Sequence, residues 1–150
     1  MKILLVCLGN ICRSPLAEGI LRNKAELMDF NLSVDSAGTS DWHTGEPPDS
    51  RGIPVAYENG IDISNLKARQ FELSDFDKFD LILAMDKSNY TELLNLSRSS
   101  NDTKKIKLFM NMAYPGVNMD VPDPYYDGRF HEVFELLDEA SEKILENINK

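Results

Sequence analysis

Cys7 and Arg13 are the residues of this chain best suited to chemistry, and five residues separate them. A cysteine thiolate is a strong nucleophile, and an arginine guanidinium is a planar donor that can hold two oxygens of a phosphoryl group. Ser14-Pro15 follows and predicts a helix start, with Ser14 as N-cap and Pro15 at the first helical position. The spacing therefore places a nucleophile and an anion-binding group at the two ends of one short loop.

The stretch before this loop positions it. Residues 3–6 form an apolar run whose length and β-branching predict a buried strand, and a turn at Gly9-Asn10 follows. The N–H groups of residues 8–13 can converge above Cys7, where the helix N-terminus adds positive charge and favours the thiolate. The alternative is that Cys7 is a small buried hydrophobe ending the strand. We expect a catalytic phosphate-binding loop made of Leu8, Gly9, Asn10, Ile11 and Cys12.

Asp123, between Pro122 and Pro124, is the candidate proton donor for the leaving group of a phosphate ester. The prolines restrict the backbone and would hold the carboxyl in place, although an Asp beside Pro is also common in simple turns. Ser14 likewise has a second role open to it, a hydrogen bond from its hydroxyl to the Cys7 sulfur.

Trp42, Tyr125 and Tyr126 lie in predicted loops beside polar and proline residues. Aromatic side chains more often belong to the core, but loop positions favour the walls of a slot that stacks an aryl ring. Such a slot favours phosphotyrosine over phosphoserine, whose phosphorus would sit too shallow to reach Cys7.

Cys12 either packs against its neighbours or captures an oxidised Cys7 as a reversible disulfide. We expect no metal site, because the chain has no Cys-x-x-Cys pair and because His43 and His131 are far apart in sequence. We expect no other cofactor.

Composition limits the class of protein. A chain of 150 residues with 42% hydrophobic residues predicts one domain, residues 1–150, without a membrane span or a signal peptide. The net charge of −9 argues against nucleic acid as a partner. Two cysteines are too few for a secreted disulfide framework, so we expect a cytoplasmic protein, as a monomer or weak dimer.

Strands and helices alternate along the rest of the chain. Further strands are predicted at residues 32–37, 80–85 and 106–110, and loops at 39–50, 97–102 and 111–128. Residues 61–79 are ambiguous apart from a helical turn near 74–78. Helices are predicted from Pro15 to about residue 29, at 50–59 with Asp49 as cap, at 88–96 and at 129–149. This alternation predicts an α/β fold, with a doubly wound parallel sheet, helices on both faces, and a ligand at the carboxyl ends of the strands.

The segment from Val6 to Pro15 resembles the signature of the low-molecular-weight protein tyrosine phosphatases, and the resemblance extends over residues 36–38, 42–48, 68–70, 80–86 and 123–126. It implies a single-domain sheet of four parallel strands and hydrolysis of phosphotyrosine and aryl phosphates. It also implies a Cys7 phosphocysteine intermediate, with Asp123 as general acid and then general base. Asn10 and Ser36 match positions that brace the loop in this family.

One position departs from the family. Leu66 stands where the family often has His, three residues before Arg69, so we expect part of the bracing network to differ. A phosphoarginine phosphatase is a close alternative, but Ile11 favours phosphotyrosine, since the arginine-specific relatives carry Thr there. An arsenate reductase would need further cysteines besides Cys12. A phosphocysteine carrier or silent phosphate binder would have no use for the hydrolytic acid/base Asp123.

Overall fold

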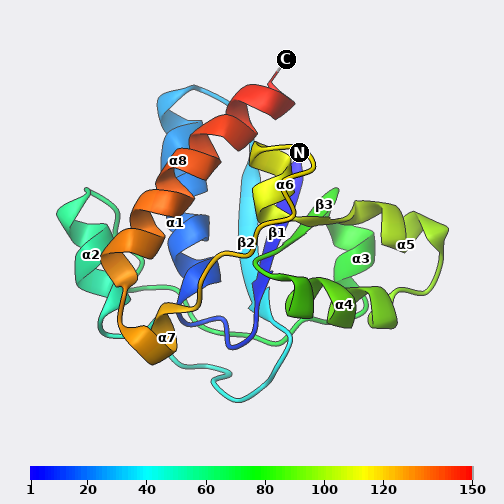
Figure 1. Cartoon of the computed structure of the whole chain (residues 1–150), viewed down its shortest axis with the longest axis horizontal. Helices are drawn as coiled ribbons and strands as arrows, with labels where there is room; N and C mark the ends of the chain where they lie inside the picture. Colours follow the sequence, from blue (N-terminus) through cyan, green and yellow to red (C-terminus); the bar gives the residue numbers. More distant parts are fainter. Residues whose placement is uncertain (150) are drawn as a thin grey trace.

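Four parallel strands form the centre of the protein, in the order β2-β1-β3-β4 (Figure 1). The computed structural model describes residues 1–149. Because β1 lies between β2 and β3, the loop that follows it leaves from an inner strand at the carboxyl edge of the sheet. The prediction of a doubly wound α/β fold with four parallel strands is confirmed. The strands are β1 (Lys2–Cys7), β2 (Ser33–Gly38), β3 (Leu81–Ala84) and β4 (Ile106–Leu108).

Helices cover both faces of this sheet, as expected from the alternating pattern. Figure 1 shows α1, α2 and α8 on one side and α3, α4 and α5 on the other. None of the helices within residues 1–149 is long and apolar enough to cross a membrane. The helices are α1 (Arg13–Leu27), α2 (Gly52–Glu58), α3 (Asp75–Lys78), α4 (Lys87–Leu96), α5 (Ser100–Lys105), α6 (Phe109–Ala113), α7 (Pro124–Asp127) and α8 (Phe130–Ile148).

The alternation of side chains along β1 divides the core into two layers. Ile3 and Leu5 face the larger layer, which contains the apolar faces of α1 and α8. Leu4 and Val6 face the smaller layer, under α3 and α4. All four side chains are fully buried, so β1 is a rigid base for the loop that it carries.

The start of α1 differs from the prediction. The helix begins at Arg13 with Cys12 as its N-cap residue, which makes no side-chain capping bond, and Pro15 is the third helical residue rather than the first. Ser14 is therefore not the N-cap. Its hydroxyl contacts Cys7 and Asn10 instead. Pro15 remains compatible with the helix, because N–H groups of the first turn have no partner inside it.

Asp49 is also not a helix cap. Helix α2 begins only at Gly52, with Arg51 as N-cap residue, and the Asp49 carboxylate accepts hydrogen bonds from the backbone and side chain of Arg51. The expected helix over residues 50–59 is correspondingly shorter. Pro54 falls in its first turn, as a proline must.

The polar residues 97–102 are not all loop, because Ser99 caps α5 by accepting from the N–H of Asp102. The fourth strand ends at Leu108, and Phe109 begins α6 where the strand was expected to continue. The segment 111–128 holds the end of α6 and the whole of α7. The helical turn near residues 74–78 is confirmed as α3.

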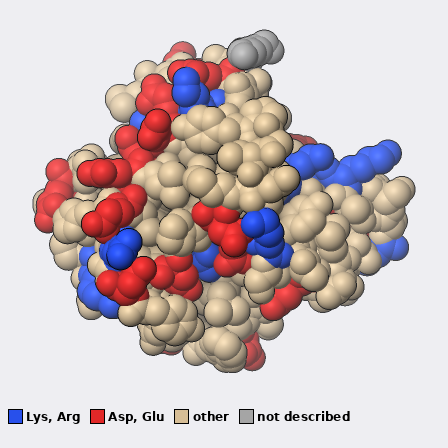
Figure 2. Space-filling model, viewed as in Figure 1, with Lys and Arg blue, Asp and Glu red and all other residues tan. Residues whose placement is uncertain are grey.

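The surface charge is unevenly distributed. In the view of Figure 2, acidic side chains predominate over the side that carries α2 and α8, and basic ones gather toward α5. This face shows no continuous basic surface of the kind that holds a nucleic acid backbone.

Candidate active site

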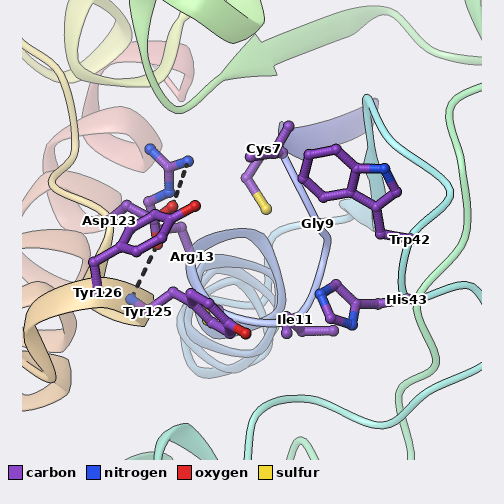
Figure 3. A pocket seen from close by; sticks show the side chains of 11 residues that line it. Cys7, Gly9, Ile11, Arg13, Trp42, His43, Asp123, Tyr125 and Tyr126 are labelled. Carbon is purple, nitrogen blue, oxygen red and sulfur yellow. Dashed lines mark hydrogen bonds and ion pairs between the residues drawn. The ribbon is translucent and has the colours of Figure 1, made fainter.

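A pocket of about 240 Å³ opens at the carboxyl edge of the sheet. Figure 3 shows the Cys7 sulfur pointing into the space enclosed by Trp42, Tyr125 and Asp123. The structure thus brings the site residues predicted from the sequence into one pocket, although Cys7 and Asp123 are more than a hundred positions apart in the chain. The pocket is lined by Cys7, Leu8, Gly9, Ile11, Cys12, Arg13, Trp42, His43, Asp123, Tyr125 and Tyr126.

The loop after β1 turns its carbonyl groups outward. The carbonyl of Leu8 accepts from the N–H of Ser40 at 3.0 Å, and that of Ile11 from the N–H of Asp49 at 2.8 Å. A trans peptide holds its N–H opposite its C=O, so the N–H groups of Gly9 and Cys12 face the other way, toward the pocket. Within residues 1–149 neither N–H has a protein acceptor. The loop can therefore offer free backbone donors to an anion above Cys7.

Gly38, at the end of β2, allows this loop to lie close to the sheet. A Cβ atom at this position would lie 2.7 Å from the Leu8 carbonyl oxygen and 3.2 Å from the Asn10 nitrogen. Asn10 itself has a left-handed backbone (φ 58°), a conformation that Asn tolerates better than most residues. The glycine of the Ser36-Ala37-Gly38 motif is thus explained by a close backbone approach.

Cys7 is 2% exposed, and its sulfur has two polar neighbours. The backbone N–H of Asn10 donates to it at 3.2 Å, and the Ser14 hydroxyl lies 3.0 Å away. Both contacts favour negative charge on sulfur if the hydroxyl donates. The predicted contact between Ser14 and the cysteine is therefore present.

Arg13 is buried beside Cys7, and its orientation is set by groups outside the loop. One terminal nitrogen, Nη1, donates to Asp86 Oδ2 at 2.8 Å and to the Val121 carbonyl at 2.9 Å. The other, Nη2, lies 3.6 Å from Asp123 Oδ2. Along residues 1–149 Nε has no hydrogen-bond partner, so the edge formed by Nε and Nη2 remains for a phosphoryl group. Burial opposes the charged form, but the nearby Cys7, Asp86 and Asp123 raise the pKa of Arg13.

Asp123 uses its two carboxylate oxygens differently. Oδ1 caps α7 by accepting from the N–H of Tyr125 at 3.1 Å, and Oδ2 faces Arg13 (Figure 3). Asp123 therefore caps a turn with one carboxylate oxygen and faces the pocket with the other. The carboxylate is about a quarter exposed, so water reaches it.

The predicted aromatic side chains form the rim of the pocket. Trp42 is 69% exposed and Tyr126 77% exposed, which excludes a core role for either. The Tyr125 and Tyr126 rings meet edge to face with centroids 5.2 Å apart. An aryl group entering the pocket would meet these rings before it reaches Cys7.

Cys12 lies in the pocket wall as a free, buried thiol. Burial raises its pKa far above the ordinary value, and the negative charges of Asp49, Cys7 and Asp123 add to the rise, with Arg51 opposing it. Cys12 is therefore protonated at neutral pH and is a weak nucleophile there. Both cysteines are free, and a disulfide between them stays a prediction.

Comparison with known proteins identifies the family. A family model described as low molecular weight phosphotyrosine protein phosphatase matches residues 2–150. The chain is 40% identical over 152 residues to the low molecular weight protein-tyrosine-phosphatase YfkJ of Bacillus subtilis, covering 100% of this chain and 97% of the relative. It is 43% identical over 143 residues to the human low molecular weight phosphotyrosine protein phosphatase, covering 89% and 87%.

The chain belongs to the low molecular weight phosphotyrosine protein phosphatase family. Solved structures agree. The crystal structure of Bacillus subtilis YfkJ superposes with a TM-score of 0.93 at 38% identity, over 99% of this chain and 94% of the other. A protein tyrosine phosphatase from Entamoeba histolytica with Hepes in the active site superposes with a TM-score of 0.91 at 37% identity, over 99% and 97%. The predicted class, a cysteine-dependent tyrosine phosphatase, is confirmed.

The Asn10 side chain braces the loop without any contribution from Leu66. The Asn10 amide nitrogen donates to Ser14 Oγ at 2.8 Å and to Ser36 Oγ at 2.9 Å. The Asn10 amide oxygen accepts from the N–H of Arg69 at 3.0 Å. Leu66 is partly buried against the larger core layer and takes no part in these contacts. The hydrogen bonds of the Asn10 side chain are thus met by Ser14, Ser36 and Arg69.

His43 is a pocket residue whose role the sequence analysis missed. Its ring lies 3.1 Å from the position of a Cβ on Gly9, and Nδ1 is 2.9 Å from Glu46 Oε2. The ring centroid is 6.4 Å from that of Tyr125. Its position directly after Trp42 could have indicated a pocket residue, but the sequence was interpreted only in terms of metal binding by His43.

Asp86 and Arg51 are two further residues with positions that matter. Asp86 caps α4 through Oδ1 and holds Arg13 through Oδ2. Arg51 pairs with Asp49, donates to the Tyr125 carbonyl at 3.2 Å, and places its guanidinium 5.6 Å from the Tyr125 ring centroid. It therefore ties the segment that carries Asp123 to the segment that holds the loop. The sequence could have indicated Asp86 as a site residue, because it follows a buried strand at the carboxyl edge of the sheet. Nothing in the sequence pattern indicates Arg51.

Proposed function

We propose that this protein hydrolyses phosphotyrosine and other aryl phosphate monoesters through a phosphocysteine formed on Cys7. The observation that carries the proposal is the environment of the Cys7 sulfur. The Asn10 N–H and the Ser14 hydroxyl contact it, the free N–H groups of Gly9 and Cys12 face the space above it, and Arg13 lies beside that space. This combination stabilises a thiolate and binds the oxygens of a phosphoryl group undergoing in-line attack.

In the first step, Cys7 attacks phosphorus and the bond from phosphorus to the aryl oxygen breaks. The backbone donors and the free edge of Arg13 hold the equatorial oxygens. Asp123 donates a proton to the departing oxygen through Oδ2, since Oδ1 is occupied by the cap of α7. The products of this step are a phenol and phosphocysteine.

In the second step, Asp123 accepts a proton from a water molecule that attacks phosphorus, and the bond to Cys7 breaks. The leaving group is now the thiolate. Ser14, whose hydroxyl lies 3.0 Å from the sulfur, stabilises that charge by donation, as does the Asn10 N–H. Inorganic phosphate is released and the thiolate is restored.

The exposed rim supports an aryl substrate. Trp42, Tyr125 and Tyr126 surround the opening and can stack on a phenyl ring, whereas the phosphorus of a phosphoserine would stop short of Cys7. Relatives at about 40% identity bear names of tyrosine phosphatases, which supports the same substrate class here. Ile11, part of the pocket wall, supports the choice of phosphotyrosine over phosphoarginine.

The test is a panel of phosphotyrosine, phosphoarginine and phosphoserine peptides, assayed without added metal. We expect turnover of the phosphotyrosine peptide in strong excess over the other two. Cys7→Ser is the control: it should abolish turnover but still bind inorganic phosphate, because the loop and Arg13 are intact. Preference for phosphoarginine, or hydrolysis by Cys7→Ser, would contradict the proposal.

A cytoplasmic location and a monomeric or weakly dimeric state complete the proposal. The two free, buried cysteines support a reducing compartment. Exposed large apolar side chains are scattered, apart from the aromatic rim, which substrate binding explains. Light scattering during gel filtration tests the oligomeric state, and a stable dimer at micromolar concentration would contradict it.

A further inference from the structure

Glu18 is a buried carboxylate that the reaction does not use. It lies in the second turn of α1, is 3% exposed, and does not line the pocket. One oxygen, Oε1, accepts from the Ser36 hydroxyl at 2.6 Å, and the other, Oε2, accepts from Arg22 at 2.6 Å. A buried charge is costly unless it is well paired, so its presence behind the loop calls for an explanation.

A continuous line of hydrogen bonds connects this carboxylate to Cys7. From Glu18 it passes to the Ser36 hydroxyl, then to the Asn10 amide nitrogen at 2.9 Å, and from that nitrogen to the Ser14 hydroxyl at 2.8 Å. The last link joins the Ser14 hydroxyl to the Cys7 sulfur at 3.0 Å. All of these side chains are buried, so water does not interrupt the line.

The chemistry of each group fixes the direction of donation along this line. A hydroxyl has a single proton, and Ser36 gives its own to the Glu18 carboxylate. Ser36 must therefore accept from Asn10, whose NH₂ group is donor only and also donates to Ser14. The proton of Ser14 is then left for the Cys7 sulfur.

We propose that Glu18 is a positioning residue that orients this line, so that the Ser14 hydroxyl donates to the Cys7 thiolate. The inference rests on the proposed function only in taking Cys7 as the nucleophile. Glu18 acts through three intervening side chains and touches neither substrate nor sulfur.

The opposite orientation of the Asn10 amide also satisfies both serine hydroxyls, so groups that oppose it are needed. If the Asn10 amide were turned over, its oxygen would accept from both Ser36 and Ser14, and the Ser14 proton would point away from Cys7. Two groups oppose that state. The N–H of Arg69 donates to the Asn10 oxygen in its present place, and Glu18 takes the proton that Ser36 would otherwise give to Asn10.

Glu18→Gln should release the second of these constraints. Arg22 can only donate, so it will bind the new amide oxygen, and the new NH₂ group will face Ser36. Ser36 then accepts from residue 18 and directs its own proton toward Asn10, which favours the turned amide. The Cys7 thiolate loses the Ser14 hydrogen bond.

The sign of the effect distinguishes this mechanism from simple electrostatics. Removing a negative charge near a thiolate stabilises the thiolate through space. Loss of a donated hydrogen bond destabilises it. An orienting role for Glu18 therefore predicts that a variant lacking its charge forms the thiolate less readily, the reverse of the Coulomb expectation.

The readout is the rate of iodoacetate alkylation of Cys7 as a function of pH, which reports thiolate formation without any turnover. We expect the midpoint of this profile in Glu18→Gln to move upward by about one pH unit, as for loss of one hydrogen bond to an ionised group. The charged and titratable groups that face Cys7 or the line are unchanged in this variant: Arg13, Arg22, Cys12, Asp35, His43, Arg69, Asp86 and Asp123.

Glu26→Gln is the matched control, because it makes the same chemical change on an exposed position of α1. Its alkylation profile should coincide with that of the wild type. An unchanged or downward-shifted midpoint in Glu18→Gln, with circular dichroism showing a folded protein, would overturn the proposal.

Ser36→Ala keeps the proposal testable if Glu18→Gln does not fold, since it breaks the line between Glu18 and Asn10. We expect an upward shift here too, and in the double variant no shift beyond that of Ser36→Ala alone. An unshifted midpoint in Ser36→Ala would equally overturn the role of Glu18. Alkylation proceeds whether or not phosphotyrosine is the substrate, so failure here is distinct from failure of the proposed function.

Discussion

Asp86 should control activity without contacting the substrate, because it holds Arg13 in place. Its Oδ2 accepts from Arg13 at 2.8 Å and its Oδ1 accepts from the N–H of Asn89 at 2.8 Å. In Asp86→Asn only one of these partners can meet the amide oxygen, and the other meets an NH₂ group that cannot accept. Asparagine is a good N-cap, so we expect it to keep the cap of α4 and release the guanidinium.

The magnitude follows from that single lost contact. A hydrogen bond between charged groups contributes about 1.5–3 kcal/mol, and each 1.36 kcal/mol of lost transition-state stabilisation lowers the rate about tenfold. We therefore expect kcat/KM to fall by about 10–100-fold. The free energy of unfolding should fall as well, by about 1–3 kcal/mol, because Arg13 is buried and loses a charged partner.

The assay is the steady-state hydrolysis of p-nitrophenyl phosphate, together with the inhibition constant of inorganic phosphate. In Asp86→Asn, kcat/KM should fall and the inhibition constant of phosphate should rise, because Arg13 binds phosphoryl oxygens in substrate and product alike. Asp120→Asn is the matched control: its carboxylate contacts Lys87, at the start of the same helix, and leaves Arg13 untouched. A kcat/KM for Asp86→Asn within about twofold of that of Asp120→Asn would refute the role given to Asp86.

Three other outcomes are expected. Asp123→Asn should lower turnover of poor leaving groups by about 10²–10⁴-fold and flatten one limb of the pH profile, and an unchanged profile measured with phenyl phosphate would mean that another acid acts. Gly38→Ala should lower the free energy of unfolding in urea by about 1–3 kcal/mol and reduce kcat, because its Cβ would lie 2.7 Å from the Leu8 carbonyl; unaltered stability would contradict this close approach. Because burial raises the pKa of Cys12, iodoacetate at neutral pH should modify Cys7 alone in the folded protein, and mass spectrometry finding equal modification of both would argue against it.

The parts of the fold that could be predicted are those that apolar patterning controls. The run at residues 3–6 is buried on both faces, as its length and β-branching indicated, and the apolar face of α8 was periodic over five turns. Helix α5 was missed because its stability comes from the Ser99 cap and from ion pairs of Arg98, with few apolar residues to mark it. The end of β4 was misplaced because Phe109 and Met110 are apolar and buried, like the residues of the strand before them.

At the site, sequence reasoning found the residues whose chemistry is local to a motif. Cys7, Arg13 and Ser14 lie on one strand-loop-helix unit, so their proximity followed from connectivity. The start of α1 was misjudged because the Ser14 hydroxyl could cap or bond sulfur, and only packing decides between them. Asp86 and Glu18 were missed for a related reason: each acts through a neighbour brought near by the tertiary fold.

Arg51 connects the loop of the nucleophile to the segment that carries the general acid. Its guanidinium grips Asp49, whose own N–H binds the carbonyl of Ile11, and reaches across to the carbonyl of Tyr125. The phosphate-binding loop and the segment that carries Asp123 are thereby connected through one side chain. We expect these hydrogen bonds to limit the displacement of Asp123 relative to the loop above Cys7 when a substrate enters or a phenol leaves.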